Sequence, residues 1–300
     1  MRKPTERAAL LKARDHFRTG ELPLAVLRMP VAQDVRFHSH EYTELVLVTQ
    51  GEGQHVTGVD TRVIRAGDVF VIHTGQAHAY RELRGLEVIN ILYDSPVVLP
   101  PSLALAALPG YQALFALEPL LRRRQGLDYR LSLGAADLTT ACGLAEAMRG
   151  ELAGRAPGYS ALAGALMVQL AVFLSRCYSR VRAPEPRALM RLGRVLTSME
   201  EHLTEPLSLA GLARTAGMSR STLTRAFRRI LRRSPIEHLI RLRLERACVR
   251  LRETDDTVTE IALAVGFNDS NYFARQFRRL MGRTPRAYRR EFLQRTARTR

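Results

Sequence analysis

The C-terminal third of the chain contains one pattern twice. Residues 209–235 read LAGLARTAGMSRSTLTRAFRRILRRSP, and residues 259–285 read TEIALAVGFNDSNYFARQFRRLMGRTP. Gly217 aligns with Gly266, and beyond this turn the second copy carries one additional residue. An internal repeat of this length indicates a supersecondary unit that is used twice.

Each copy follows the plan of a helix-turn-helix, which is a short helix, a glycine turn and a second helix, closed here by a proline. Ser219 and Asp269 stand where the second helices should begin and are the expected N-caps. Residues 236–252 predict a connecting helix of about 25 Å, which would hold both second helices on one face of DNA. The apolar residues expected to point into the module recur at helical spacing; they are Leu223, Ala226, Phe227 and Ile230, then Phe273, Phe277 and Leu280.

The opposite face of each second helix carries short polar side chains followed by arginines. Such residues near a helix N-terminus can reach base edges in a major groove, and arginines further along can reach phosphates. A solvated cationic face is the alternative, but turn, cap and apolar stripe agree in both copies. The expected DNA contacts are Ser221, Thr224, Arg225, Arg228 and Arg229 in the first copy, and Asn271, Arg275, Arg278 and Arg279 in the second.

The positive charge of the chain is concentrated in the same region. Residues 188–300 hold 24 arginines against 11 acidic residues, a net charge of +13 out of +17 for the whole chain. A GC-rich genome would also favour arginine over lysine, so the segregation of the charge is more informative than the arginine content. A localised cationic field favours a polyanionic partner such as DNA.

Residues 24–99 are β-rich and alternating, with glycines between the apolar runs, which predicts a small antiparallel barrel or sandwich. His38, His40 and Glu44 are separated by even numbers of residues, so their side chains can face the same side of a strand. His78 follows in a second segment, GDVFVIHTGQAHAY. The two segments resemble the paired motifs of the cupin barrel, and this resemblance implies that His78 joins the other three residues in a set that can hydrogen-bond a polyol or hold Fe, Mn, Ni or Zn. His55 and His73 are expected in the pocket wall or at the surface.

In the middle of the chain, Ala/Leu-rich stretches predict helices near residues 112–123, 135–153 and 159–180. The last of these stretches is apolar around much of its circumference, so it must be buried in its own domain or against another subunit, and we favour a subunit interface. Its longest apolar run, residues 161–174, is too short to span a bilayer. The Pro-rich residues 182–187 predict a linker. The three cysteines form no CxxC pair, which fits a reducing cytoplasm.

The repeat resembles the paired helix-turn-helix domain of AraC/XylS-type transcription regulators over residues 189–292. The segments GMSRSTLTRAFRR and GFNDSNYFARQFRRLMGRTPRAYRRE carry the resemblance. It implies that Ser221, Thr224 and Arg225, and then Ser270, Asn271 and Arg275, fall where members of the family read bases. Ala274 replaces a polar base-reading residue.

The two histidine segments resemble the paired motifs of the cupin barrel. Ala32, His73 and Glu82 depart from the usual glycine, proline and asparagine of those motifs. Residues 24–120 are also similar to the sensor domains of the L-rhamnose catabolism regulators, which implies a sugar-type effector such as rhamnose. In AraC-type regulators the cupin is usually metal-free, so we expect no cofactor and favour direct effector binding by His38, His40, Glu44 and His78 over a metal site at the same residues.

The sequence therefore predicts two domains. An all-β cupin-like sensor (1–100) with a helical dimerisation region (101–181) is followed by a linker (182–187) and an all-α DNA-binding domain with two helix-turn-helix units (188–300). The predicted protein is a cytoplasmic, homodimeric regulator, more specifically an activator, that binds an operator, a carbohydrate-like effector and RNA polymerase, and no membrane. A metal-dependent cupin isomerase or dioxygenase fused to a DNA-binding tail is the alternative. An architectural DNA-binding protein without an effector is disfavoured, because a polar-lined barrel would have no function in such a protein.

Overall fold

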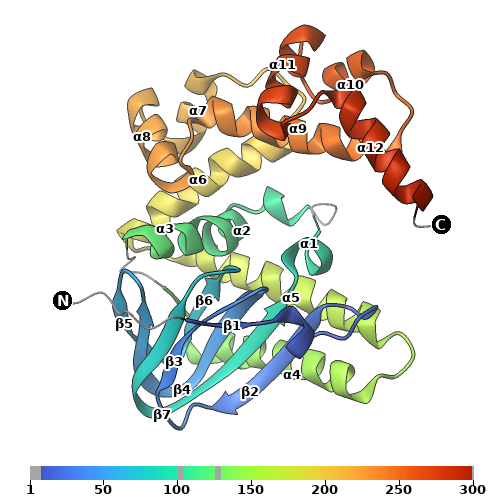
Figure 1. Cartoon of the computed structure of the whole chain (residues 1–300). Coiled ribbons are helices and arrows are strands. Elements are labelled where there is room, and N and C mark those ends of the chain that lie inside the picture. Colours follow the sequence, from blue (N-terminus) through green and yellow to red (C-terminus); the bar gives the residue numbers. More distant parts are fainter. Residues whose placement is uncertain (1–7, 101–103, 126–129, 299–300) are drawn as a thin grey trace. The chain divides into compact units, whose positions relative to one another are not determined.

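The computed structural model describes residues 8–100, 104–125 and 130–298. Parts of the predicted 1–100 and 101–181 regions, namely residues 1–7, 101–103 and 126–129, lie outside the described residues. The chain divides into two compact units, Met1–Gly193 and Arg194–Arg300, and each is described by itself (Figure 1).

The first unit is built on an eight-stranded sheet with the path β1-β3-β7-β4-β6-β8, to which β2 adds on β7 and β5 on β4. The strands are β1 (Ala9–Leu11), β2 (Leu24–Pro30), β3 (Val35–His40), β4 (Thr43–Thr57), β5 (Thr61–Arg65), β6 (Asp68–Ile72), β7 (His78–Tyr93) and β8 (Leu131–Ser132). The expected β-rich character of residues 24–99 is confirmed.

The long strands β4 and β7 pair antiparallel along nearly their whole length, from Thr43 opposite Tyr93 to Thr57 opposite His78. Three register shifts interrupt this ladder, and such bulges bend the strands. The curled sheet encloses an apolar interior that includes the fully buried Val46, Phe70 and Val88. In the central part of β4 both faces are buried, since Leu45 and Leu47 are as inaccessible as Val46 and Val48.

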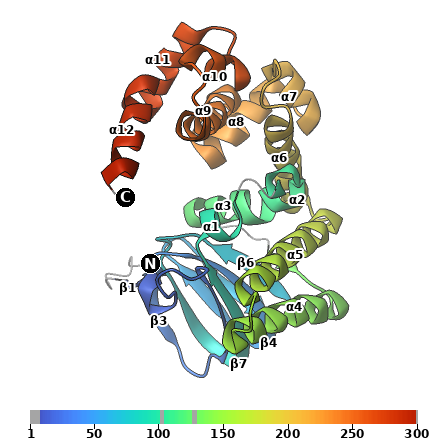
Figure 2. The ribbon, with the colours of Figure 1, turned by 90° about the vertical axis from the view of Figure 1, so that its right-hand side faces the viewer.

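Helices cover part of this sheet (Figure 2). They include α1 (Ser95–Val98), α2 (Pro109–Tyr111), the π-helical turn Gln112–Leu117, α3 (Glu118–Gln125), α4 (Ala135–Gly154) and α5 (Tyr159–Arg180). By length and composition alone α5 could cross a membrane. However, its Met167, Leu170 and Leu174 are fully buried within the chain, as in the core helix of a globular unit. The opposite face of α5 keeps Leu162 48% exposed, which leaves the expected subunit contact as a prediction.

The segment expected to be a linker does not form an extended connection. Helix α6 (Pro184–Glu201) begins inside residues 182–187, and the boundary between the compact units falls within this helix, after Gly193. Prolines at Pro184 and Pro186 are compatible with a helix here, because the N–H groups of a first turn have no acceptor within the helix.

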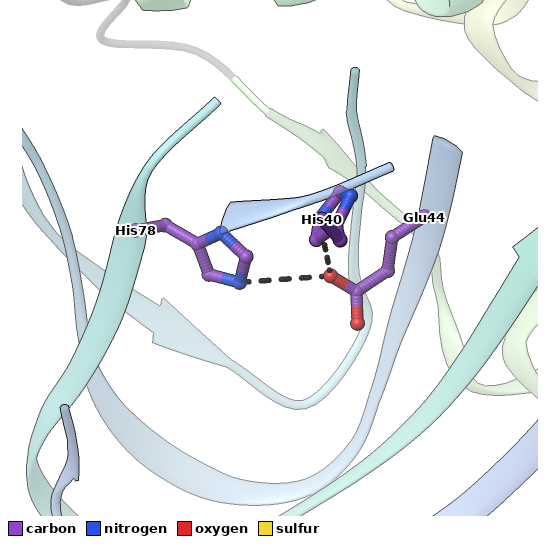
Figure 3. Close-up of side chains that lie close together, drawn as sticks. All are labelled: His40, Glu44 and His78. Atoms are coloured by element: carbon purple, nitrogen blue, oxygen red, sulfur yellow. Dashed lines mark ion pairs between the residues drawn. The ribbon is translucent and has the colours of Figure 1, made fainter. Parts of the chain in front are cut away.

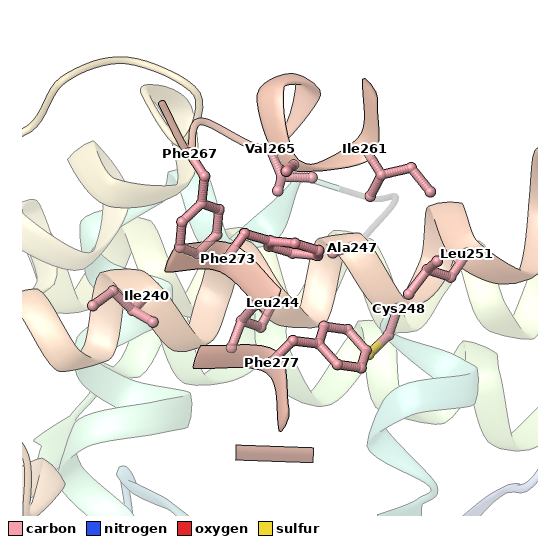
Figure 4. Packing of buried hydrophobic residues seen from close by; sticks show 11 residues of the cluster. Ile240, Leu244, Ala247, Cys248, Leu251, Ile261, Val265, Phe267, Phe273 and Phe277 are labelled. Atoms are coloured by element: carbon pink, nitrogen blue, oxygen red, sulfur yellow. The ribbon is translucent and has the colours of Figure 1, made fainter. Parts of the chain in front are cut away.

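The second unit contains the two predicted helix-turn-helix motifs. They are formed by α7 (Leu209–Ala216) with α8 (Arg220–Leu231), and by α10 (Val258–Ala264) with α11 (Ser270–Met281). The connecting helix α9 (Pro235–Glu253) is present as expected, and α12 (Pro285–Arg298) follows the second motif. Buried residues of α9, α10, α11 and the turn between α10 and α11 form one apolar cluster around Leu244, Phe273 and Phe277 (Figure 4).

Local sequence signals explain where the second helices begin. The Ser219 hydroxyl accepts a hydrogen bond from the Thr222 N–H at 3.1 Å, and the Asp269 carboxylate accepts from the N–H groups of Asn271 and Tyr272. Both expected N-caps are therefore confirmed. The expectation that Leu280 points into the module is wrong, since Leu280 is 39% exposed and Met281 packs against the cluster instead. In the last turn of α11, Met281 packs against the core, whereas Leu280 lies on a side of the helix that the core does not reach.

Two glycines of the second unit provide a matched test of backbone constraint. Gly266 and Gly282 both have positive φ, of 89° and 73°. A Cβ at Gly266 would lie 2.9 Å from backbone atoms of Leu203 and Thr204, whereas nothing lies within 4 Å at Gly282. We expect Gly282→Ala to cost about 1–2 kcal/mol from left-handed strain alone, and Gly266→Ala to cost clearly more. Urea unfolding of both variants measures the difference, and equal losses would contradict this account of the turn.

Candidate effector pocket and DNA-contacting helices

Three of the four predicted pocket residues meet inside the barrel (Figure 3). The Glu44 Oε2 atom lies 3.3 Å from His40 Nε2 and 3.6 Å from His78 Nε2. All three side chains are at most 5% exposed. His40 ends β3, Glu44 lies near the start of β4 and His78 begins β7, so three strand ends converge on one point.

The predicted fourth residue, His38, lies beside this cluster. Its ring centroid is 4.2 Å from that of His78, and its side chain lines the same cavity as His40 and Glu44. The expectation that His38, His40 and Glu44 share one strand is wrong, because β3 ends at His40 and β4 begins at Thr43; the three side chains nevertheless line one cavity. The structure brings together all four candidates, although His38 is less buried than the other three.

Backbone carbonyls fix the orientation of the imidazole rings. His40 Nδ1 lies 2.6 Å from the Tyr42 carbonyl oxygen, and His78 Nδ1 lies 3.3 Å from that of Gln76. A carbonyl oxygen can only accept, so in each ring Nδ1 carries the hydrogen and Nε2 presents a lone pair unless the ring is cationic. The two Nε2 atoms and Glu44 Oε2 have no hydrogen-bond partner among the described residues.

Burial and neighbouring charges set the protonation of this cluster. Burial, further assisted by the charges of His38 and His40, lowers the pKa of His78 to about 4 in spite of the opposing effect of Glu44. For Glu44, burial acts to raise the pKa, but the neighbouring His40, His78 and His38 together lower it. The cluster therefore contains an ionised carboxylate facing a neutral His78 at neutral pH.

The donor set fits a divalent transition-metal ion. The three ligand atoms of His40, Glu44 and His78 lie within 4.8 Å of one another, and carbonyl oxygens hold two of the rings from behind. This is the arrangement in which nitrogen and carboxylate ligands bind such ions. The same unpartnered atoms can equally accept hydrogen bonds from ligand hydroxyls.

The cluster opens into a cavity of about 430 Å³ between β1, β2, β3, β4 and β7. Asn90 of β7 also lines it, and sequence analysis did not select this residue. A single amide within the apolar run VINILY is the signal that could have indicated it. A cavity of this size, with few polar groups in an apolar wall, is typical of small-molecule sites.

His55 lies behind the cavity rather than at the surface. It is fully buried, with its ring centroid 5.5 Å from that of His78, and its Nδ1 lies 3.2 Å from the Arg130 guanidinium. Burial holds its pKa well below the ordinary value. His73 is different, because its Nε2 bonds the Phe115 carbonyl at 2.8 Å and thus ties β6 to the turn before α3.

The predicted DNA-contacting residues lie on one side of α8 and of α11. Thr224 and Ser270 are half-buried, and the other members are exposed; these are Ser221, Arg225, Arg228, Arg229, Asn271, Arg275, Arg278 and Arg279. The opposite faces bury Leu223, Phe227 and Ile230 in α8 and Phe273 and Phe277 in α11. Each helix is therefore anchored by its apolar stripe and presents its polar stripe to solvent.

Comparisons with known proteins agree with the cupin-like fold of the first half of the chain and with the helix-turn-helix motifs of the second. A cupin domain model matches residues 25–91, and a helix-turn-helix domain model matches residues 212–291. The "HTH-type transcriptional activator RhaR" of Yersinia pseudotuberculosis is 29% identical over 95% of this chain and 94% of its own length. The corresponding RhaS of Pectobacterium atrosepticum is 28% identical over 93% of this chain and 96% of its own. An AraC-type DNA-binding domain structure from Chromobacterium violaceum is 33% identical, covering 34% of this chain and 91% of that one, with a TM-score of 0.33.

The phase of the helices predicts different roles for the arginines. Arg225 and Arg275 share the stripe of Ser221 and Asn271, so Arg225→Ala and Arg275→Ala should each relax specificity at particular operator bases, at about 1–3 kcal/mol. Arg229→Ala should weaken binding to all sequences alike. Quantitative footprinting on operators with single base changes measures both effects, and identical profiles for the three variants would show that the helix phase is misassigned.

Proposed function

Because the chain belongs to the AraC/XylS-type transcription regulators, with a cupin domain ahead of a paired helix-turn-helix domain, we propose that it activates genes in response to a sugar-type effector bound in the cupin cavity. The chain is a DNA-binding regulator, and α8 and α11 are the elements proposed to enter the major groove. The observation that carries the effector proposal is that His40 and Glu44, which line the cavity, have buried acceptor atoms without a partner, and that His78 Nε2 lies 3.6 Å from Glu44 Oε2.

The pocket residues have a defined task in this proposal. The Glu44 carboxylate and the Nε2 lone pairs accept hydrogen bonds from neighbouring hydroxyls of the effector, while the backbone carbonyls keep the rings in place. A divalent metal held by His40, Glu44 and His78 would supply Lewis-acid coordination of the same hydroxyls. The effector acts only if it binds two arrangements of the protein with different affinity.

The remaining partners are proposed with the function. We propose a cytoplasmic homodimer that is joined through α4 and α5. Its two DNA-binding units bind an operator, and the DNA-bound protein contacts RNA polymerase. The exposed Leu162 on α5 supports an apolar contact on that face. We propose no catalytic activity, because the relatives are transcription regulators. The metal-capable donor set keeps a cupin isomerase or dioxygenase as the second candidate, and sugar turnover by metal-loaded protein would favour it.

Removal of the pocket side chains tests the effector proposal. His38→Ala, His40→Ala, Glu44→Ala and His78→Ala should each abolish the response of DNA binding to effector, with L-rhamnose as the first probe, and leave basal DNA affinity unchanged. Electrophoretic mobility shift with and without the sugar measures both. Elemental analysis of protein purified without a His tag separates a metal site from direct binding. A normal response in all four variants would place the effector elsewhere.

Salt dependence tests the DNA-binding mode. The exposed arginines of α8 and α11 should neutralise about four to eight phosphates per subunit, so that log K against log salt has a slope of about −4 to −7 per subunit. Fluorescence anisotropy with a labelled operator at several salt concentrations gives the slope. A nearly flat line would contradict the proposed contacts.

A further inference from the structure

The polarity of the cavity changes along the direction of its strands. Glu44 of β4 pairs with Leu92 of β7, and two residues further along the ladder Asn90 lies opposite Val46. The next inward pair is Val48 with Val88, which is wholly apolar. At about 3.3 Å per residue, Glu44 and the Val48 pair are separated by about 13 Å. Along this ladder the polar side chains Glu44 and Asn90 therefore lie toward one end of the cavity, while Arg36 and Tyr80 also line the cavity.

Strand β2 supplies the apolar wall. Leu27 pairs with Asn90, and Met29 pairs with Val88, so both extend the inner face of β7. Arg28, between them, points to the opposite side, where it forms ion pairs with Glu87 and Glu146. Leu27 and Met29 line the cavity and remain 36% and 38% exposed. Large apolar side chains open to a cavity are favourably covered by an apolar ligand group.

A fully hydroxylated sugar fits only one end of this cavity. Hydroxyls near His40 and Glu44 find acceptors, whereas hydroxyls against Leu27, Met29 and Val88 would lose water without gaining a partner. A ligand with its oxygens at one end and carbon at the other avoids this penalty. Such a ligand contacts both the polar end and the apolar wall of the cavity.

We propose that the effector is amphipathic, with vicinal oxygens that meet His40 and Glu44 and an aliphatic or aromatic group that covers Leu27, Met29 and Val88. This inference rests on the proposed role of the cavity as the effector site. Among sugar-type effectors, the proposal selects those that lack some hydroxyls or carry an alkyl or aryl group.

A series of vicinal diols tests the inference directly. Propane-1,2-diol, butane-1,2-diol, hexane-1,2-diol and octane-1,2-diol share one polar end and differ in their apolar chain, and erythritol is the fully hydroxylated reference. Titration calorimetry with the full-length chain gives each affinity. Each added methylene should improve affinity by up to about fourfold until the cavity is filled, and erythritol should bind more weakly than hexane-1,2-diol.

Variants locate the two ends of the ligand. Met29→Gln, of similar size, and independently Leu27→Gln should flatten the chain-length dependence, whereas Val59→Gln, at a 52% exposed site in a turn, should not. Glu44→Gln should weaken every diol by a similar factor. Thermal unfolding shows that each variant is folded.

The outcomes separate this inference from the proposed function. Affinity that is independent of chain length, with erythritol binding through Glu44, would overturn the amphipathic effector and leave the pocket function in place. An unchanged chain-length dependence in both Met29→Gln and Leu27→Gln would also overturn it, because the chain would then bind elsewhere. Failure of every compound to bind would overturn the inference and count against the cavity as the effector site.

Discussion

The pairing of β4 with β7 is the constraint on which the effector half depends. Glu44 lies near one end of this ladder, opposite Leu92, and His78 lies at the other end, opposite Thr57. In a straight strand, the 13 steps from position 44 to position 57 would separate the two ends by about 43 Å. Yet Glu44 Oε2 and His78 Nε2 are 3.6 Å apart. The ladder must therefore curl fully around the barrel, and its register shifts allow it to do so. Any change that straightens these strands would separate the carboxylate from the imidazole.

Part of this arrangement could be predicted from the sequence. Strand parity placed His38 and His40 on one side of β3, and the cap, turn and apolar spacing identified both helix-turn-helix units. His78 was accessible only through the resemblance to cupin motifs, because parity within one strand carries no information on a strand about 35 residues away. The apolar wall was not predicted. Leu27 and Met29 belong to an ordinary alternating strand, and only the register with Asn90 and Val88 shows that they face the cavity.

The structure also shows why polar groups can be buried behind the pocket. His55 and Arg130 are stabilised by each other and by the Phe70 ring, whose centroid lies 5.0 Å from the Arg130 guanidinium carbon. Burial keeps His55 neutral, so its contact with Arg130 avoids the repulsion of two cations. Such a network favours one packing of the barrel over alternatives. The sequence could not indicate it, because its members come from three separate segments.

The N-caps of the two recognition helices differ in charge. Ser219 is neutral, and α8 carries Arg220, Arg225, Arg228 and Arg229. Asp269 is anionic, its pKa lowered by the N–H groups of Tyr272 and Asn271, and α11 carries three arginines. The carboxylate occupies the amides that could otherwise hold a phosphate and adds a negative charge near the DNA backbone. In the proposed complex with DNA, the first helix would gain more from attraction to the backbone, and the second would depend more on matching its bases. The two motifs arise from one repeated pattern, yet under the proposed function this difference in charge would give each subunit a preferred direction on DNA.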